Sequence, residues 1–160
     1  MKKITLFLIL IILLVSACSP YNEEGLPPDP IDAYLLVIDK LYEDDIALND
    51  NIKYLAINTT TMANLNQEGR VTLLEELEKY GYTVLDMTFD ELEKEGYIRD
   101  LYFKEGILIR IEDEVMEENI IKMNASKWKS GLGAIGYDGM TLEYNDDIWE
   151  VTGLVSNWIS

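Results

Sequence analysis

The segment Gly131-Leu132-Gly133-Ala134-Ile135-Gly136 has the G-x-G-x-x-G spacing with which a dinucleotide-binding loop brings backbone amides against a pyrophosphate. That fingerprint also requires a helix that opens on its last glycine and an acidic residue about 20 positions later. Here Tyr137-Asp138-Gly139 and a two-residue period follow instead. The pattern therefore predicts no nucleotide site. We interpret the glycines as positions where the chain bends or bulges between two strands: Gly131, Gly133, Gly136 and Gly139.

A second motif, Ser126-Lys127-Trp128-Lys129, has the S-x-x-K spacing of a serine nucleophile assisted by a lysine one helical turn away. The segment joins strand-like sequence to the glycines, and the companion sequences S-D-N and K-T-G are missing. We therefore expect no catalysis at Ser126. Lys127 and Lys129 are expected to supply positive charge on an acidic surface.

The chain contains no histidine, which removes the commonest general base, the Ser-His-Asp and Cys-His arrangements and the usual zinc sites. Its 30 Asp and Glu residues leave one enzymatic alternative, a carboxylate-based hydrolase of envelope polymers. Three stretches are oxygen-rich enough to suggest calcium, but none has the D-x-[DN]-x-[DN]-G spacing: Glu112-Asp113-Glu114, Glu117-Glu118 and Asn145-Asp146-Asp147. The sequence assigns no catalytic residue, no metal ligand and no cofactor.

Residues 1–17 have the three parts of a secretion signal: two lysines, an apolar run from Ile4 to Val15, and small residues before Cys18. At ~1.5 Å per helical residue the run reaches only ~18 Å, short of the ~30 Å hydrocarbon core of a bilayer. A permanent membrane span is therefore not expected. Cys18 is the only cysteine, so it has no partner for an internal disulfide.

Val15-Ser16-Ala17-Cys18 resembles the lipobox of bacterial lipoproteins. The resemblance implies a diacylglycerol on the Cys18 sulfur, cleavage between Ala17 and Cys18, and a lipid anchor on the outer face of the bacterial cytoplasmic membrane. Two acyl chains, at ~0.8 kcal/mol per buried CH₂, form a stable anchor. The alternative is an ordinary secretory signal with a chance cysteine. Residues 18–30 then form the lipidated start and a Pro- and Gly-containing tether, and residues 31–160 one domain.

The formal charge of −17 falls to −19 when Lys2 and Lys3 leave with the signal. A domain with this negative charge repels nucleic acid and anionic lipid headgroups, so we expect no nucleic-acid partner. The 48% of hydrophobic residues predicts a packed core rather than a disordered chain.

The secondary-structure elements that position these residues are predicted to be mainly helices in the first half of the chain and strands in the second half. Cap signals and periodicity predict three helices: one from Asp29-Pro30 to about Leu48, one from Gln67 to Tyr80 that stops at Gly81, and a short one between Thr88 and Gly96. Short apolar or alternating runs predict the strands: 52–59, 82–87, 107–112, 120–125, 140–144, 148–152 and 154–159. This order predicts an α+β domain with a largely antiparallel sheet covered on one face, possessing a curved cystatin-like or NTF2-like shape.

Many aromatic residues fall in the second half: Tyr97, Tyr102, Phe103, Trp128, Tyr137, Trp149 and Trp158. They suit either a ligand or peptide platform on a concave sheet face or, as we favour, core packing and cross-strand pairs.

The ending is similar to an uncharacterised family of small exported Gram-positive proteins, through A-S-K-W-K-S-G-L-G-A-I-G, the earlier E-L-E-K-E-G-Y-I-R-D, and I-W-E-V with W-I-S. Some relatives carry a peptide-transporter substrate-binding label, although 160 residues are too few for two lobes. The resemblance implies binding and brings no catalytic residues. We therefore expect a membrane-anchored lipoprotein that binds a peptide, a small molecule or an envelope protein. Besides the hydrolase, a further alternative is an accessory or immunity-like lipoprotein whose acidic face blocks a basic partner.

Overall fold

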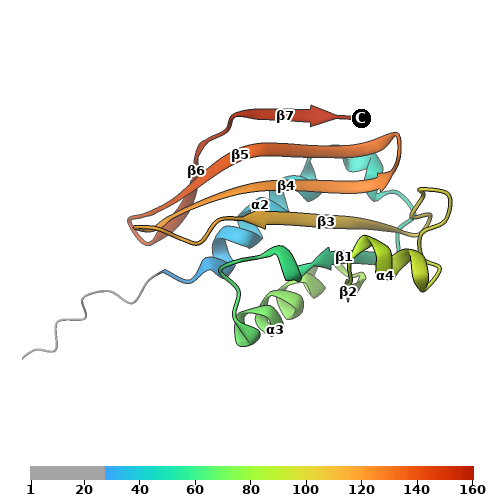
Figure 1. Cartoon of the computed structure of the whole chain (residues 1–160), viewed down its shortest axis with the longest axis horizontal. Helices are drawn as coiled ribbons and strands as arrows, with labels where there is room; N and C mark the ends of the chain where they lie inside the picture. The colour runs from blue at the N-terminus through green and yellow to red at the C-terminus, as the bar shows by residue number, and fades with distance from the viewer. Residues whose placement is uncertain (1–27) are drawn as a thin grey trace, which may run out of the picture.

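The computed structural model describes residues 28–160 (Figure 1). The expectations for the signal peptide, for Ala17 and Cys18 and for most of the tether lie outside these described residues. Within residues 28–160, no helix combines the length and the hydropathy that a membrane crossing requires.

Helices and two short strands make up the first half of the described chain. The helices are α2 (Pro30–Glu43), α3 (Gln67–Glu76) and α4 (Phe89–Lys94), with 3-10 turns η1 (Ile46–Asn49), η2 (Thr59–Thr61) and η3 (Leu77–Tyr80) and strands β1 (Tyr54–Asn58) and β2 (Thr83–Asp86). The second half contains only strands: β3 (Gly106–Asp113), β4 (Ile120–Ser130), β5 (Gly133–Asn145), β6 (Ile148–Gly153) and β7 (Ser156–Ile159).

All seven strands form one sheet in the order β2-β1-β3-β4-β5-β6, with β7 also pairing with β5. β1 runs parallel to both β2 and β3, and the other pairs are antiparallel. β6 pairs with Thr141–Asn145 and β7 with Ile135–Asp138, so the two strands follow each other along the same side of β5. The predicted α+β class with a largely antiparallel sheet is confirmed, and the sheet is mixed and not closed. The cystatin-like or NTF2-like shape stays a prediction.

The sheet has two different faces, which we call the α2 side and the α4 side (Figure 1). On the α2 side, Tyr34, Ile38 and Leu41 of α2 join the main core, to which the sheet contributes Ile107, Ile109 and Ile111. The predicted alternation of β3 is therefore confirmed. On the α4 side a smaller cluster gathers Leu92 of α4 with the half-buried Trp128 and other residues: Ala56, Ile98, Phe103 and Leu108. Further along the α4 side, Lys122, Asn124 and Asp138 are exposed.

The predicted helix ends follow local signals. The Asp29 carboxylate accepts a hydrogen bond from the Ile31 amide at 3.0 Å, and Thr88 and Glu91 form a reciprocal capping box. Gly81 has φ 78°, the left-handed conformation expected after a helix end. These three predictions are confirmed because each depends only on neighbouring residues.

Three predicted boundaries are wrong. α2 ends at Glu43 rather than near Leu48, and Asp45 has φ 49°. β4 continues past Ala125 to Ser130, and β5 begins at Gly133, so Gly136 and Gly139 lie inside a strand and not between two strands. Contacts distant in sequence, described below, lie at two of these places: Lys127 at the end of α2 and Trp158 against Gly136 of β5.

Candidate interaction surface

The S-x-x-K residues lie on β4, where side chains alternate between the two faces of the sheet. Ser126 pairs with Arg110 of β3 and Gly136 of β5. The Lys129 amine instead reaches the α2 side, where it donates to the backbone carbonyls of Leu48 at 2.9 Å and Asp50 at 2.8 Å. The lysine amine therefore does not activate Ser126, which agrees with the expectation of no catalysis there.

Lys127 corrects the expectation that this lysine adds charge to the surface, because its side chain is fully buried. Its ammonium donates to four oxygens: Asp44 O at 2.6 Å, Asp45 O at 3.1 Å, Asn49 Oδ1 at 3.1 Å and Tyr42 O at 3.4 Å. Burial lowers the pKa of Lys127 to about 8, while the charges of Asp45 and Asp44 oppose this shift. Lys127 satisfies carbonyl groups at the end of α2, which explains why the helix stops there.

Two of the four glycines, Gly136 and Gly139, have a conformational role, each for a different reason, whereas an added Cβ at Gly131 would meet no other atom within 4 Å. A Cβ at position 136 would overlap the indole ring of Trp158, so Gly136 allows β7 to lie against β5. Gly139 has φ 62° and lies at a register shift of the β4–β5 ladder, which confirms the predicted bulge. Because β5 continues through this segment, no helix offers its N-terminus to a phosphate.

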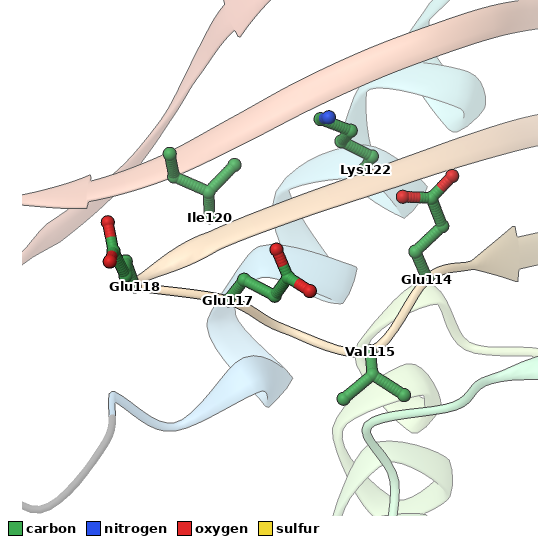
Figure 2. A pocket seen from close by; sticks show the side chains of 6 residues that line it. All are labelled: Glu114, Val115, Glu117, Glu118, Ile120 and Lys122. Carbon is green, nitrogen blue, oxygen red and sulfur yellow. The ribbon is translucent and has the colours of Figure 1, made fainter.

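Three residues of the oxygen-rich stretches, Glu114, Glu117 and Glu118, border an open depression of about 560 Å³ beside the β3–β4 turn (Figure 2). Its lining is Glu114, Val115, Glu117, Glu118, Ile120 and Lys122. The three carboxylates are spread along the loop and are exposed. The part of the chain that the structure describes has no group of three or more acidic side chains that could hold a metal ion. The structure therefore provides no support for calcium at these turns.

Most of the aromatic residues pack in the core, as favoured. Phe103, Tyr137 and Trp149 are buried, and the Trp128 ring lies edge-on to Phe89 with centroids 5.1 Å apart. Tyr102 and Trp158 are exceptions, since both are exposed.

Tyr102 belongs to a tight hairpin whose turn residues are unusual. Arg99 and Tyr102 exchange backbone hydrogen bonds of 3.1 and 2.9 Å, and between them Asp100 and Leu101 have φ 50° and 56°. Two successive positive φ angles define a type I′ turn, which favours Asn, Asp and Gly. Leucine is a poor residue for this conformation because its Cβ approaches the following carbonyl oxygen.

The strained turn lies beside the β4–β5 turn. The Gly131 amide donates to the Leu101 carbonyl at 3.1 Å, and Tyr102 forms a bridge with Ser130. Three side chains in these turns are strongly exposed although each is largely apolar: Leu132 at 91%, Leu101 at 59% and Tyr102 at 44%. We call Leu101, Tyr102 and Leu132 the distal apolar surface.

This surface is remote from the point where the described chain begins. The Asp29 carbonyl accepts a hydrogen bond of 2.9 Å from the Trp149 indole, and Trp149 pairs with Tyr144 near the end of β5. Gly133, next to Leu132, is at the start of the same strand. At ~3.3 Å per strand residue, Tyr144 and Gly133 are ~35 Å apart. Figure 1 shows the chain entering at one end of the sheet and the β4–β5 turn at the other.

No sequence motif predicts a role for Leu101 or Leu132. The exposure of Leu132 could have been predicted from the sequence, because a leucine between two glycines in a hairpin connection is expected to lie outside the core. The positive φ angle of Leu101 could not have been predicted, since the sequence Asp-Leu is not typical of a type I′ turn.

The chain matches no protein-family model, no curated protein and no solved structure. The resemblances to the lipobox and to the family of small exported proteins therefore stay predictions.

Proposed function

We propose that the protein is a lipid-anchored extracytoplasmic binding module whose distal apolar surface contacts a protein of the bacterial envelope. The observation that carries the proposal is Leu101, which is exposed and has a left-handed backbone conformation. Such a conformation costs ~1–2 kcal/mol for a residue with a Cβ. Neither burial nor turn preference offsets this cost in the isolated domain, whereas a partner that covers the leucine would.

The position of the surface supports the same reading. Leu101, Tyr102 and Leu132 come from two turns held together by backbone hydrogen bonds, so the three side chains form a fixed group. The β4–β5 turn, to which the turn at residues 100–101 is hydrogen-bonded, lies at the end of the sheet opposite the entry of the chain from its N-terminal side (Figure 1). In a protein held by lipid at Cys18, this is the end of the domain farthest from the attachment point, where a partner has access.

The hydrolase alternative has one feature in its favour, the carboxylates of Glu114, Glu117 and Glu118 around the depression in Figure 2. A glycosidase acid is normally held in a desolvated pocket, which keeps its proton at neutral pH. These three side chains are exposed. The binding module is therefore the better-supported function.

Photocrosslinking in living cells tests the proposal. A photoreactive amino acid at Leu101 or at Leu132 should label the same envelope protein. The matched control is Val71 on α3, a similarly exposed apolar residue outside the distal apolar surface, which should not label it. Labelling of the same protein from all three positions, or from none, would show that the distal apolar surface is not the contact.

Membrane attachment is tested separately. Cys18→Ser should release the protein from membranes and leave the signal uncut by the lipoprotein peptidase. Unchanged retention with normal processing would contradict the lipid anchor.

A further inference from the structure

The outer side of β7 is an unpaired sheet edge. β7 pairs with β5 alone, and no described element lies beyond it (Figure 1). Ser160 exchanges both backbone hydrogen bonds with Ala134, at 2.9 and 3.3 Å. In an antiparallel ladder, hydrogen-bonded pairs alternate with non-hydrogen-bonded pairs. The N–H and C=O groups of Asn157 and Ile159 therefore point away from β5 and are available to another strand.

Although β7 is short, with four residues, it lacks the side-chain features that usually prevent pairing with another chain. Natural edge strands carry lysine, proline or a bulge that discourages addition of a further strand. Residues 154–160, L-V-S-N-W-I-S, contain no charged residue, no proline and no glycine. Val155, Trp158 and Ile159 are exposed. The segment is thus uncharged, exposes apolar side chains and is geometrically free to accept a strand.

Side chains on both faces would receive an incoming strand. The Trp158 ring covers Gly136 on the α4 side. Ile159 pairs with Ile135, which belongs to the main core on the α2 side. An added strand would therefore meet an indole on one face and an isoleucine on the other, so its alternate side chains need to be apolar on at least one face.

Charge decides between a second copy and a different partner. The edge is uncharged but is flanked by Asp138, which accepts hydrogen bonds from Ser156 Oγ at 3.1 Å and Trp158 Nε1 at 3.4 Å. The full chain carries a formal charge of −17. Two copies brought together at this edge would repel each other, whereas a cationic strand would be attracted.

We propose that the β7 edge binds an extended, cationic segment of another protein, which adds as an eighth strand through backbone hydrogen bonds to Asn157 and Ile159. This mode is strand addition, in which main-chain bonds provide affinity and alternate side chains provide selectivity. It does not depend on the distal apolar surface, because a different set of groups makes the contact.

The test uses the full chain and a blocked nonapeptide in which valine alternates with lysine, with binding followed by calorimetry at low and at physiological salt. We expect binding that weakens as salt rises. Two matched peptides should each bind at least ~10-fold more weakly, equivalent to ~1.4 kcal/mol. In one, N-methylation removes alternate N–H groups, and in the other, glutamate replaces lysine. No binding of the lysine peptide, or equal binding of either control peptide, would overturn the proposal.

A pair of variants locates the contact. Ile159→Pro removes an outward N–H that β5 does not use, so it should abolish peptide binding with little change in the melting temperature. Ile159→Thr keeps that N–H and should retain binding within a few-fold. Equal binding by the proline variant would exclude pairing at this edge.

Two further measurements distinguish this proposal from self-association at the β7 edge and from binding at the distal apolar surface. If the full chain sediments as a dimer and Ile159→Pro makes it a monomer, the occupant is a second copy and the proposal is wrong. Leu101→Asn should leave peptide binding unchanged, so failure of the distal apolar surface and failure of the β7 edge give different results.

Discussion

Replacing Lys127 by methionine tests the claim that a buried ammonium closes the end of α2. Lys127→Met keeps a side chain of similar length but removes every hydrogen bond from the amine. Of its four acceptors, the Tyr42 carbonyl also accepts a hydrogen bond from the Asn49 side-chain Nδ2 at 2.7 Å, and the Asp45 carbonyl also accepts one from the Leu48 backbone amide at 3.1 Å. The other two acceptors, Asp44 O and Asn49 Oδ1, have no such second donor. The substitution therefore removes the lysine hydrogen bond from both of them.

The expected loss of stability follows from those two groups. The buried Asn49 Oδ1 left without a partner costs ~1–3 kcal/mol, and the part-buried carbonyl of the exposed Asp44 costs less. The methionine side chain is cheaper to bury than an ammonium, which offsets part of this cost. We expect a net loss of ~1–3 kcal/mol in the free energy of unfolding, a substantial share of the ~5–15 kcal/mol typical of a domain.

The assay is urea unfolding at pH 7 followed by circular dichroism, together with amide hydrogen exchange at residues 44–49. Exchange there should accelerate, because the segment loses its tie to β4. Lys122→Met is the matched control, since Lys122 is an exposed lysine on the same strand and its replacement should change stability by less than ~0.5 kcal/mol. If Lys127→Met is as stable as this control, the ammonium does not hold the end of α2 and our reasoning is wrong.

Four further predictions follow from single features. Leu101→Asn should raise the free energy of unfolding by up to ~1 kcal/mol, since asparagine tolerates positive φ, and unchanged or lower stability in a urea titration would remove the strain argument. Gly136→Ala should lower the melting temperature because the new Cβ overlaps the Trp158 ring, and Trp158→Ala in the same chain should restore part of the loss. Burial and the Asp113 carboxylate raise the pKa of Tyr34, so above about pH 10 the unfolded chain releases a proton that the folded chain keeps. The contribution of this group to the free energy of unfolding should therefore fall by ~1.4 kcal/mol per pH unit. Tyr34→Phe should show a correspondingly shallower fall of stability with rising pH in base titrations. Because the pKa of Lys127 is lowered to about 8, this group binds more protons in the unfolded chain between about pH 8 and 10.5; its contribution to stability should rise with pH there, visibly so below the tyrosine range near pH 10, and Lys127→Met should lack the rise.

Local features of the fold could be predicted because the groups involved are close in the chain. The Asp29 cap, the Thr88–Glu91 capping box and the Gly81 helix end each join residues within three positions, and the structure has all three. The alternation of Ile107, Ile109 and Ile111 needs only the two-residue period of a strand. The α+β class then follows from the order of helices and strands.

The sequence could predict which motifs form no site, but it could not predict the distal apolar surface. The missing companion motifs predicted no catalysis at Ser126, and the sequence after Gly136 predicted no nucleotide loop. The distal apolar surface joins a turn at residues 100–101 to one near residue 131, and the strain at Leu101 becomes visible only through its φ angle.

The sequence by itself determined the composition-level properties of this protein: its strong negative charge, the absence of histidine chemistry, the caps and the alternating strands, since all of these depend on residue types and near neighbours. Tertiary structure alone decided where α2 ends, which lysine is buried, why Gly136 must be glycine and which strand remains an open edge. The Lys127 amine is 82 residues from the Asp45 carbonyl that it contacts, and Trp158 lies against a glycine far earlier in the chain. Such contacts form only when the whole sheet assembles, so no local pattern encodes them.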